Sequence, residues 1–434
     1  METVSNAPAW AEANFKSIDS GGSFHGVRTS AFQRFQALGL PTPANEEWKY
    51  TNVGALAKTP FALGDVGPIA NEALAPFLPA GLTTIRLVFV NGVLNNNLSQ
   101  PSPGIAGLTI ESLQGFLSGQ GGSLGNVVAS HFAKHAAYSE HAFVALNTAF
   151  VTDGAVIKVE RGKRIETPIH IVHVTTAQQA ELMTAPRVLV VAEAHAVVNV
   201  IESFLTFGST PTLTTAVTEI VADENAEVHH YKLAEEGPAA YHVSTVQIAQ
   251  AASSRVRTTT FSFGGKVVRN EVNATLQGEE CSTGMLGLTV LKGDQHVDNH
   301  TVLDHAKPRC ESRELYKGIY ADRSSGVFNG TIIVRPDAQK TNAFQSNRAL
   351  LLSTEASIDS QPQLKIWADD VKCTHGATVG QLDEDSLFYL RSRGIPYETA
   401  RGMLIHAFAG EVVSEIGIKE LKAYVEDRLE KALF

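Results

Sequence analysis

One short segment of the sequence brings together residue types that bind metals, with Cys373 and His375 two positions apart. If this segment is a β-strand, the two side chains share one face, about 6 to 7 Å apart along the strand. A soft thiolate beside an imidazole suits a late first-row metal or an iron–sulfur cluster. Packed core groups are the alternative, because free cysteine is among the most buried residue types and a lone histidine is usually hydrogen-bonded structure.

A second group of candidate ligands is His296, Asp298 and His300, followed by Asp304 and His305. The first three alternate, so they would share one face of a strand. Two histidines and a carboxylate match the composition of a facial-triad metal site. The commoner arrangement of such residues, and the one we expect, is a solvated polar face of a β-sheet.

The adjacent residues Asp369 and Asp370 could act as paired carboxylates, as in β-helical polysaccharide lyases and hydrolases. Neighbouring strand residues point to opposite faces, however, so a turn before the strand is the better interpretation. The sequence also lacks the motifs of phosphate-binding loops, dinucleotide folds and zinc hydrolases. We therefore expect a non-catalytic protein that does not itself hydrolyse nucleotides.

The elements that position these residues are mostly strands. From Val151 to about residue 385 the sequence shows β-branched alternation, as in 169–174, without helical periodicity. A weak repeat is present, because Ala192–Val198 shares alanine, an acid, alanine and valine in register with Ala222–Val228. A parallel β-helix would stack these small residues coil upon coil. Two similar strand–turn–strand units in a sandwich are the alternative.

The N-terminal part has a mixed pattern. Apolar residues at helical spacing predict two helices within residues 7–37, separated by Gly21-Gly22. A strand is predicted at 86–90, and a short helix around Ile110 to Leu117 within a loop. These elements indicate an N-terminal helical and mixed α/β domain.

Helical periodicity returns after Gln381. Asp383 is a suitable N-cap, and Glu384 and Asp385 suit the positive end of a helix dipole. The clearest amphipathic helix runs from Ile418 to Leu433. We expect a helical cap that closes the protein. The predicted domains are 1–150 (N-terminal), 151–385 (β core) and 386–434 (C-terminal helices).

Composition excludes several classes of protein. The 434 residues carry a formal charge of -10, which opposes binding to nucleic acid or to anionic lipid. No apolar run approaches the roughly 18 residues of a membrane span, and the first residues do not have the pattern of a secretory signal or transit peptide. Three cysteines without a Cys-x-x-Cys pair fit a reducing compartment. We expect a cytoplasmic protein that binds neither nucleic acid nor membrane.

The last 140 or so residues resemble the signature of the SufB/SufD family of iron–sulfur cluster assembly proteins. The absence of cysteine before Cys281, and Gly376 directly after His375, resemble the SufD branch rather than its paralogue SufB. The segments that carry the resemblance are 361–380, 388–396, 295–298, 310–313, 327–330 and 45–50.

This resemblance implies a right-handed parallel β-helix between an N-terminal α/β domain and a C-terminal helical domain. It implies a heterodimer with SufB through the core, a homodimer when the chain is isolated, and binding of the SufC ATPase to the C-terminal helices. His375 would lie near a nascent cluster shared with SufB, with Cys373 as its less certain neighbour and no tightly bound cofactor. The residues implied for ATPase binding are Arg391, Arg393, Gly394, Ile395 and Pro396.

A role in assembly fits better than a redox role. Stable clusters typically have four protein ligands, whereas one Cys–His pair supplies at most two. The other ligands must come from a partner or from small molecules, and incomplete ligation makes a cluster transferable. A structural partner of SufB that binds no iron is the main alternative, and a β-helical carbohydrate-active enzyme is a weaker one.

Overall fold

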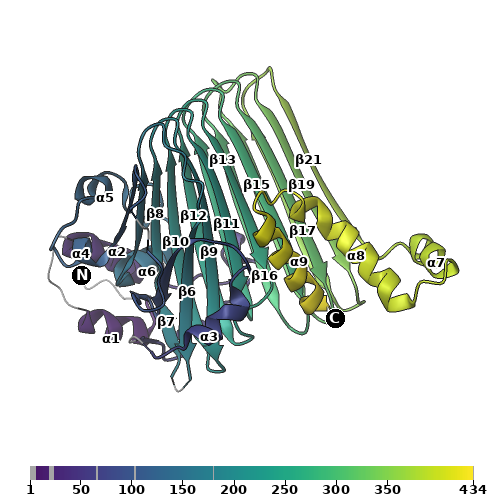
Figure 1. Cartoon of the computed structure of the whole chain (residues 1–434), viewed down its shortest axis with the longest axis horizontal. Helices are drawn as coiled ribbons and strands as arrows, with labels where there is room; N and C mark the ends of the chain where they lie inside the picture. The colour runs from purple at the N-terminus through teal and green to yellow at the C-terminus, as the bar shows by residue number, and fades with distance from the viewer. Residues whose placement is uncertain (1–5, 19–23, 65–66, 102–103, 179, 434) are drawn as a thin grey trace.

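The computed structural model of the chain describes residues 6–18, 24–64, 67–101, 104–178 and 180–433. Two long, mostly parallel β-sheets lie face to face and run the length of the molecule (Figure 1). This is a β-solenoid, so the predicted parallel β-helix is confirmed. The Gly21-Gly22 break lies outside the described residues, and the right-handed sense of the coil stays a prediction.

The described residues form 11 strands in the first sheet and 10 in the second. The first sheet contains β1 (Ala62–Leu63), β4 (Leu108–Ser112), β5 (Gly154–Val159), β7 (Leu182–Thr184), β8 (Arg187–Ala192), β10 (Thr212–Ala222), β12 (Ala240–Gln250), β14 (Val267–Leu276), β16 (His296–His305), β18 (Ser325–Val334) and β20 (Ser357–Ile366). The second contains β2 (Ile85–Val90), β3 (Val93–Leu94), β6 (Ile169–Ala177), β9 (Val197–Gly208), β11 (Glu227–Glu235), β13 (Arg255–Ser262), β15 (Ser282–Leu291), β17 (Glu311–Tyr320), β19 (Asn342–Leu351) and β21 (Lys372–Gly380).

Each coil contributes one strand to each sheet, and the sequence repeat sets the register between coils. Ala192 pairs with Ala222 in the first sheet, and Val198 pairs with Val228 in the second. Alternate residues of every strand point inward, where alanine, valine and isoleucine form one continuous core. The repeat seen in the sequence is therefore the stacking period of the solenoid.

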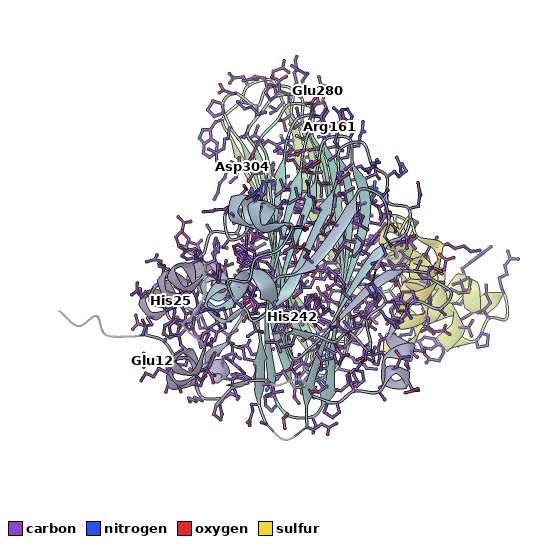
Figure 2. The ribbon with its side chains drawn as sticks, turned by 60° about the vertical axis from the view of Figure 1, so that its left-hand side comes forward. Glu12, His25, Arg161, His242, Glu280 and Asp304 are labelled. Atoms are coloured by element: carbon purple, nitrogen blue, oxygen red, sulfur yellow. The ribbon has the colours of Figure 1, made fainter. Side chains whose placement is uncertain are left out.

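The coils turn at residues with left-handed backbone conformation along one margin. Asn225 has φ 57°, and its amide donates to the carbonyl of Ala252 in the next coil at 3.0 Å. Glu280, with φ 58°, lies at this margin in Figure 2, whereas His242 lies among the strands. The equivalent left-handed residues of other coils are His195, Ser253, Arg309 and Lys340.

The helical segments lie outside the sheets. The described ones are α1 (Ala9–Ser17), α2 (His25–Leu38), η1 (Glu46–Trp48), η2 (Gly54–Ala57), α3 (Asn71–Leu74), η3 (Ala75–Phe77), α4 (Gln114–Leu117), α5 (Gly125–His131), α6 (Ala142–Phe150), α7 (Glu384–Ser392), α8 (Tyr397–Val413) and α9 (Lys419–Leu433). Within the described residues, no helix is long and apolar enough to span a membrane.

The N-terminal part confirms two predictions and corrects one. The two helices predicted within 7–37 are α1 and α2, and the predicted strand at 86–90 is β2. The helix predicted around Ile110 to Leu117 is wrong in its first half, because Leu108–Ser112 is β4 and only α4 is helical. Tertiary pairing overrides the local helical pattern, because β4 pairs antiparallel with the largely buried strand β5.

The C-terminal helices do not close the end of the solenoid, so the predicted cap is wrong. Helices α8 and α9 pack on the outer face of the second sheet, against β15 and β17 (Figure 1). The outward residues of that sheet, such as Leu315 and Ile319, are apolar and are buried against Ile405 and Leu421. The helices bury more apolar surface on this outer face than they would bury at the end of the last coil, and apolar burial favours the first arrangement. The last coil, built from β20 and β21, is therefore left open.

Candidate functional site

The open end of the solenoid is a sheet edge without a partner. In the described part of the chain, β20 pairs only with β18 and β21 only with β19. Two apolar side chains beside these edges, Trp367 and Val379, are 59% and 53% exposed. Native proteins rarely leave a long edge of this kind uncovered, because it can pair with another chain.

Cys373 and His375 both lie on β21, at this open end. Cys373 pairs in register with Ala343, and His375 with Gln345, and both partners are buried inside the solenoid. Because side chains alternate along a strand, Cys373 and His375 belong to the same inward-facing row of the last coil. His375 is exposed at the mouth of the solenoid, whereas Cys373 is partly buried against the core.

The surroundings of Cys373 make it a weaker candidate ligand than His375. Burial raises the pKa of the Cys373 thiol, which disfavours the thiolate that would bind a metal. Lys372, the neighbouring cation, is on the outward-facing row and cannot reach inward to offset this. Within the described residues, no group of three or more His, Cys, Asp or Glu side chains could hold a metal ion. The pair alone is thus at most half of a cluster site.

The other two cysteines lie two and three coils before this pair, in the same core. Cys281 and Cys310 are free thiols buried inside the solenoid, at neighbouring coil turns. Their Sγ atoms lie 3.2 and 3.3 Å from the carbonyl oxygen of Gly278. They pack as small core residues.

The second candidate group, on β16, is buried rather than solvated. The Asp298 carboxylate is 1% exposed and is 2.6 Å from both Arg269 Nη1 and the Thr51 hydroxyl. His300 Nε2 lies 2.9 Å from the same carboxylate, and His296 Nε2 lies 2.9 Å from Thr51 Oγ1. The expectation of a solvated face is therefore wrong, and these histidines form an ionic and hydrogen-bonded network.

The cover over this network comes from the N-terminal segment around η1. The Arg269 guanidinium lies 4.0 Å from the centre of the Trp48 ring and donates to the Glu47 carbonyl oxygen at 2.6 Å. Burial alone would raise the pKa of Asp298, but the adjacent Arg269 and His300 outweigh burial and lower it. Asp298 is thus a charged anchor between the sheet and the N-terminal segment.

The remaining acidic candidates are structural. Asp304 forms an ion pair with Arg335 at 2.7 Å, and the buried His305 Nε2 is 2.9 Å from Ser312 Oγ. Asp369 and Asp370 lie in the turn between β20 and β21, as predicted. The Asp370 carboxylate pairs with Lys340.

Residues 391–396 comprise the end of α7 and the turn that leads to Pro396, the N-cap of α8. Gly394 has φ 84° and follows the end of α7, and Arg393 lies 5.1 Å from the centre of the Tyr389 ring. Helix α7 has no buried residue, and Phe388 on it is 74% exposed. In Figure 1, α7 projects beyond the last strands. This helix and turn present an aromatic surface without a partner in the described chain.

Sequence reasoning missed two buried polar groups of the interior. Glu314 and Gln345 precede His375 in the same inward row, one per coil, and are 0% exposed. Their spacings from each other and from His375, of 31 and 30 residues, are close to the 30-residue repeat, and that spacing was the available signal. They are the polar groups that the fold places directly behind His375.

A separate polar cluster ties the two sheets together in the middle coils of the solenoid. Lys232, on β11, donates to Asn270 Oδ1, on β14, at 2.7 Å. Burial lowers the pKa of Lys232 to about 7. His242 Nδ1, from β12, lies 2.6 Å from Glu236 Oε2. These contacts cross the interior and lie several coils away from β21.

Comparison with known proteins gives matches over nearly the whole chain. Residues 173–408 match the SufBD core domain of the SUF system for FeS cluster assembly, and residues 14–171 match the N-terminal region of SufBD proteins. An iron–sulfur cluster assembly SufBD family protein of Synechocystis is 35% identical over 91% of this chain and 88% of its own length. The iron–sulfur cluster assembly protein SufD of Escherichia coli is 34% identical over 92% of this chain and 91% of its own. SufD of Bacillus subtilis is 30% identical over 67% of each.

Proposed function

The chain belongs to the SufBD family of iron–sulfur cluster assembly proteins, and we propose that it is the non-catalytic SufD-like subunit of a SufBCD scaffold complex. In this complex it partners SufB and the SufC ATPase, and nascent clusters are built and passed on. The observation that carries the proposal is the open end of the solenoid, where unpaired edges, exposed apolar residues and His375 occur together.

The open end suits a heterodimer with SufB through the β-helix core. The edges of β20 and β21 offer backbone donors and acceptors to a partner strand, and main-chain pairing of this kind is a common recognition mode. Trp367 and Val379 add apolar surface that pairing would bury. When SufB is absent, the same edges are available to a second copy of the chain, so we expect the isolated chain to be able to form a homodimer.

The nascent cluster is cargo held between the two subunits. His375 is exposed at the mouth, and a neutral imidazole accepts iron while donating less strongly than a thiolate, which favours later release. Cys373 is the secondary ligand, because burial raises its pKa and favours the thiol. With at most two ligands on this chain, the others come from SufB.

The SufC ATPase binds the surface made by α7 and the turn at Arg391, Arg393, Gly394, Ile395 and Pro396. This surface projects beyond the last strands (Figure 1), and the exposed Phe388 lies on it. Helix α8, which continues from the turn, is fixed to the second sheet. Movement of α7 by the ATPase would therefore reach the core that carries β21.

Two exposed aromatic residues give a reciprocal test of the interfaces. We expect Trp367→Asp to lose SufB and keep SufC, and Phe388→Asp to lose SufC and keep SufB, because each change puts a charge into one apolar contact only. Each variant serves as the control for the other. Truncation before Asp383 should also abolish ATPase binding, but it uncovers the apolar outer face of the second sheet.

The measurement is native mass spectrometry of complexes purified anaerobically after co-expression with SufB and SufC. The wild-type complex should contain all three subunits and bound iron and sulfide. A folded Phe388→Asp chain that still binds SufC at wild-type level would refute the ATPase site. A chain that purifies without SufB would refute the subunit assignment.

A further inference from the structure

We propose that Gln345 and Glu314 are positioning residues for His375. The side-chain oxygen of Gln345 accepts a hydrogen bond from one imidazole nitrogen, which leaves the other nitrogen unprotonated and directed at the iron. Glu314 fixes the Gln345 amide from behind. This inference rests on the proposed role of His375 as a cluster ligand.

The three residues form one inward-facing column across the last three coils. Glu314 on β17 pairs in register with Gln345 on β19, which pairs in register with His375 on β21. Neighbouring strands lie about 4.8 Å apart, so side chains on one face of such a column are within hydrogen-bond reach. Gln345 is therefore the polar side chain next to His375 on the core side.

The Gln345 amide has a defined orientation. Its Nε2 donates to Glu314 Oε2 at 2.6 Å, and both side chains are 0% exposed. The facing strand makes room for this amide, because a Cβ added at Gly330 would come within 2.4 Å of Gln345 Nε2. With Nε2 committed to Glu314, the amide presents its oxygen as the remaining acceptor.

That oxygen has no hydrogen-bond partner in the described residues, although the side chain is fully buried. A buried acceptor without a donor is costly, so such atoms usually mark a missing partner. In the column, the next side chain is the imidazole of His375, which carries a ring N–H. One hydrogen bond would therefore satisfy the Gln345 oxygen and select the tautomer of His375.

This arrangement is what an iron-binding histidine needs. Metal-bound histidines almost always donate their second ring nitrogen to an outer acceptor, which fixes the tautomer and the ring orientation. Without the acceptor the imidazole would rotate freely at the solvent-exposed mouth. Gln345 and Glu314 thus place part of the cluster site inside the chain, before any partner binds.

The tautomer of His375 tests the inference directly. In ¹⁵N-histidine NMR spectra of the full-length chain, assigned with His375→Ala, we expect the wild-type ring to be held in one tautomer. Gln345→Leu should return it to the mixture typical of histidine in water, whereas Gln345→Glu, which keeps an acceptor, should preserve it. Asn347→Ala, on the same inward face of β19, is the matched control and should change nothing. A wild-type ring that already behaves as in water would overturn the inference without any variant.

Iron content separates this inference from the proposed function. In co-expressed complexes, Gln345→Leu should lower iron and sulfide by at least about twofold, in line with the 10- to 100-fold loss of affinity usual for outer partners of metal ligands. Gln345→Glu should stay near wild type. If His375→Ala loses the cluster but Gln345→Leu changes neither tautomer nor iron, only the positioning role fails. If His375→Ala keeps its iron, the ligand role itself fails.

Discussion

At the scale of single residues, the buried Asp298 shows why the His296 group is structural. Its carboxylate pairs with Arg269, which is itself 2% exposed. The hydroxyl of Thr51, 247 residues earlier in the chain, completes the contact. The anchor joins the N-terminal segment to the same sheet that ends in β20.

We predict that Asp298→Ala lowers the free energy of unfolding by about 3 kcal/mol, because it removes one of the two carboxylates that pair with the buried Arg269 guanidinium, while Glu271 remains as the second. The midpoint of denaturant unfolding, followed by tryptophan fluorescence, measures this. Asp294→Ala is the control, since Asp294 pairs with Arg323 on the surface and its loss should leave the midpoint almost unchanged. Equal midpoints for the two variants would contradict the anchor.

A second residue, Glu314, makes stability depend on pH. Burial raises the pKa of its carboxyl to about 7 from the model-compound value of 4.5, so the folded chain keeps a proton that the unfolded chain releases. The unfolded state therefore binds fewer protons between about pH 5 and 7, and stability falls as pH rises through that window.

We predict that Glu314→Gln removes this loss, which amounts to at most about 3 kcal/mol for a shift of this size. Wild type and variant should have similar unfolding midpoints at pH 5, and the variant should be the more stable at pH 8. Glu311→Gln, on the exposed face of the same strand, should behave as wild type. If the unfolding midpoint of the wild type instead rises relative to that of Glu314→Gln between pH 5 and 8, the prediction is contradicted.

At the residue scale, the sequence predicted the shared face of Cys373 and His375 but not the burial of the His296 group. Alternation along a strand is a local property, and β21 obeys it. Burial of Asp298 depends on a segment far away in the chain, which no local pattern at 296–300 reports. The same holds for Glu314, whose neighbours become apparent only when the coils are stacked in register.

At the scale of elements, helix α8 is held on the second sheet by charges as well as by apolar packing. Glu411 Oε2 lies 2.6 Å from Lys317 Nζ and 3.2 Å from Arg348 Nη1. Glu415, one turn later, accepts from Arg313 at 2.7 Å. Lys317 and Arg313 lie on β17 and Arg348 on β19, so the contacts join the helix to strands that lead toward β21.

We predict that Glu411→Gln loosens α8, because Lys317 is nearly buried and loses its charged partner. Glu411 is partly exposed, so the effect should be modest, about 1 kcal/mol or roughly fivefold faster amide exchange in α8. Hydrogen–deuterium exchange with mass spectrometry measures it, with Glu398→Gln on the exposed face as the control. Unchanged exchange in α8 would mean that apolar packing alone holds the helix.

The sequence predicted helices and strands correctly where a local periodic pattern determines them. It failed where packing against another element determines the structure. The repeat at Ala192 and Ala222 predicted the stacking register that the two sheets adopt. The strand at 108–112 was missed because its pairing with β5 overrides a weak helical pattern. The predicted cap was wrong because the amphipathic pattern of α9 shows only that the helix covers an apolar surface. It does not show that this surface is the outer face of the second sheet.

At the scale of the whole molecule, the solenoid has three regions along its axis, which differ in what covers them. The N-terminal domain covers the early coils, α8 and α9 cover one side of the later coils, and the last coil is left open with His375 at its mouth (Figure 1). Such a layout suits a subunit whose end is completed by another protein. The alternative, a partner that only stabilises SufB, would use the same open edges but would not need the imidazole.

The most direct test of this account is the iron and acid-labile sulfide content of the complex formed with SufB and SufC when the chain carries His375→Ala. Thr374→Ala, on the outward face of the same strand, is the matched control. The account predicts an intact complex with its cluster content sharply reduced by His375→Ala, reduced less by Cys373→Ala, and unchanged by Thr374→Ala. An intact His375→Ala complex that carries as much iron and sulfide as wild type would contradict it and leave the chain a structural partner.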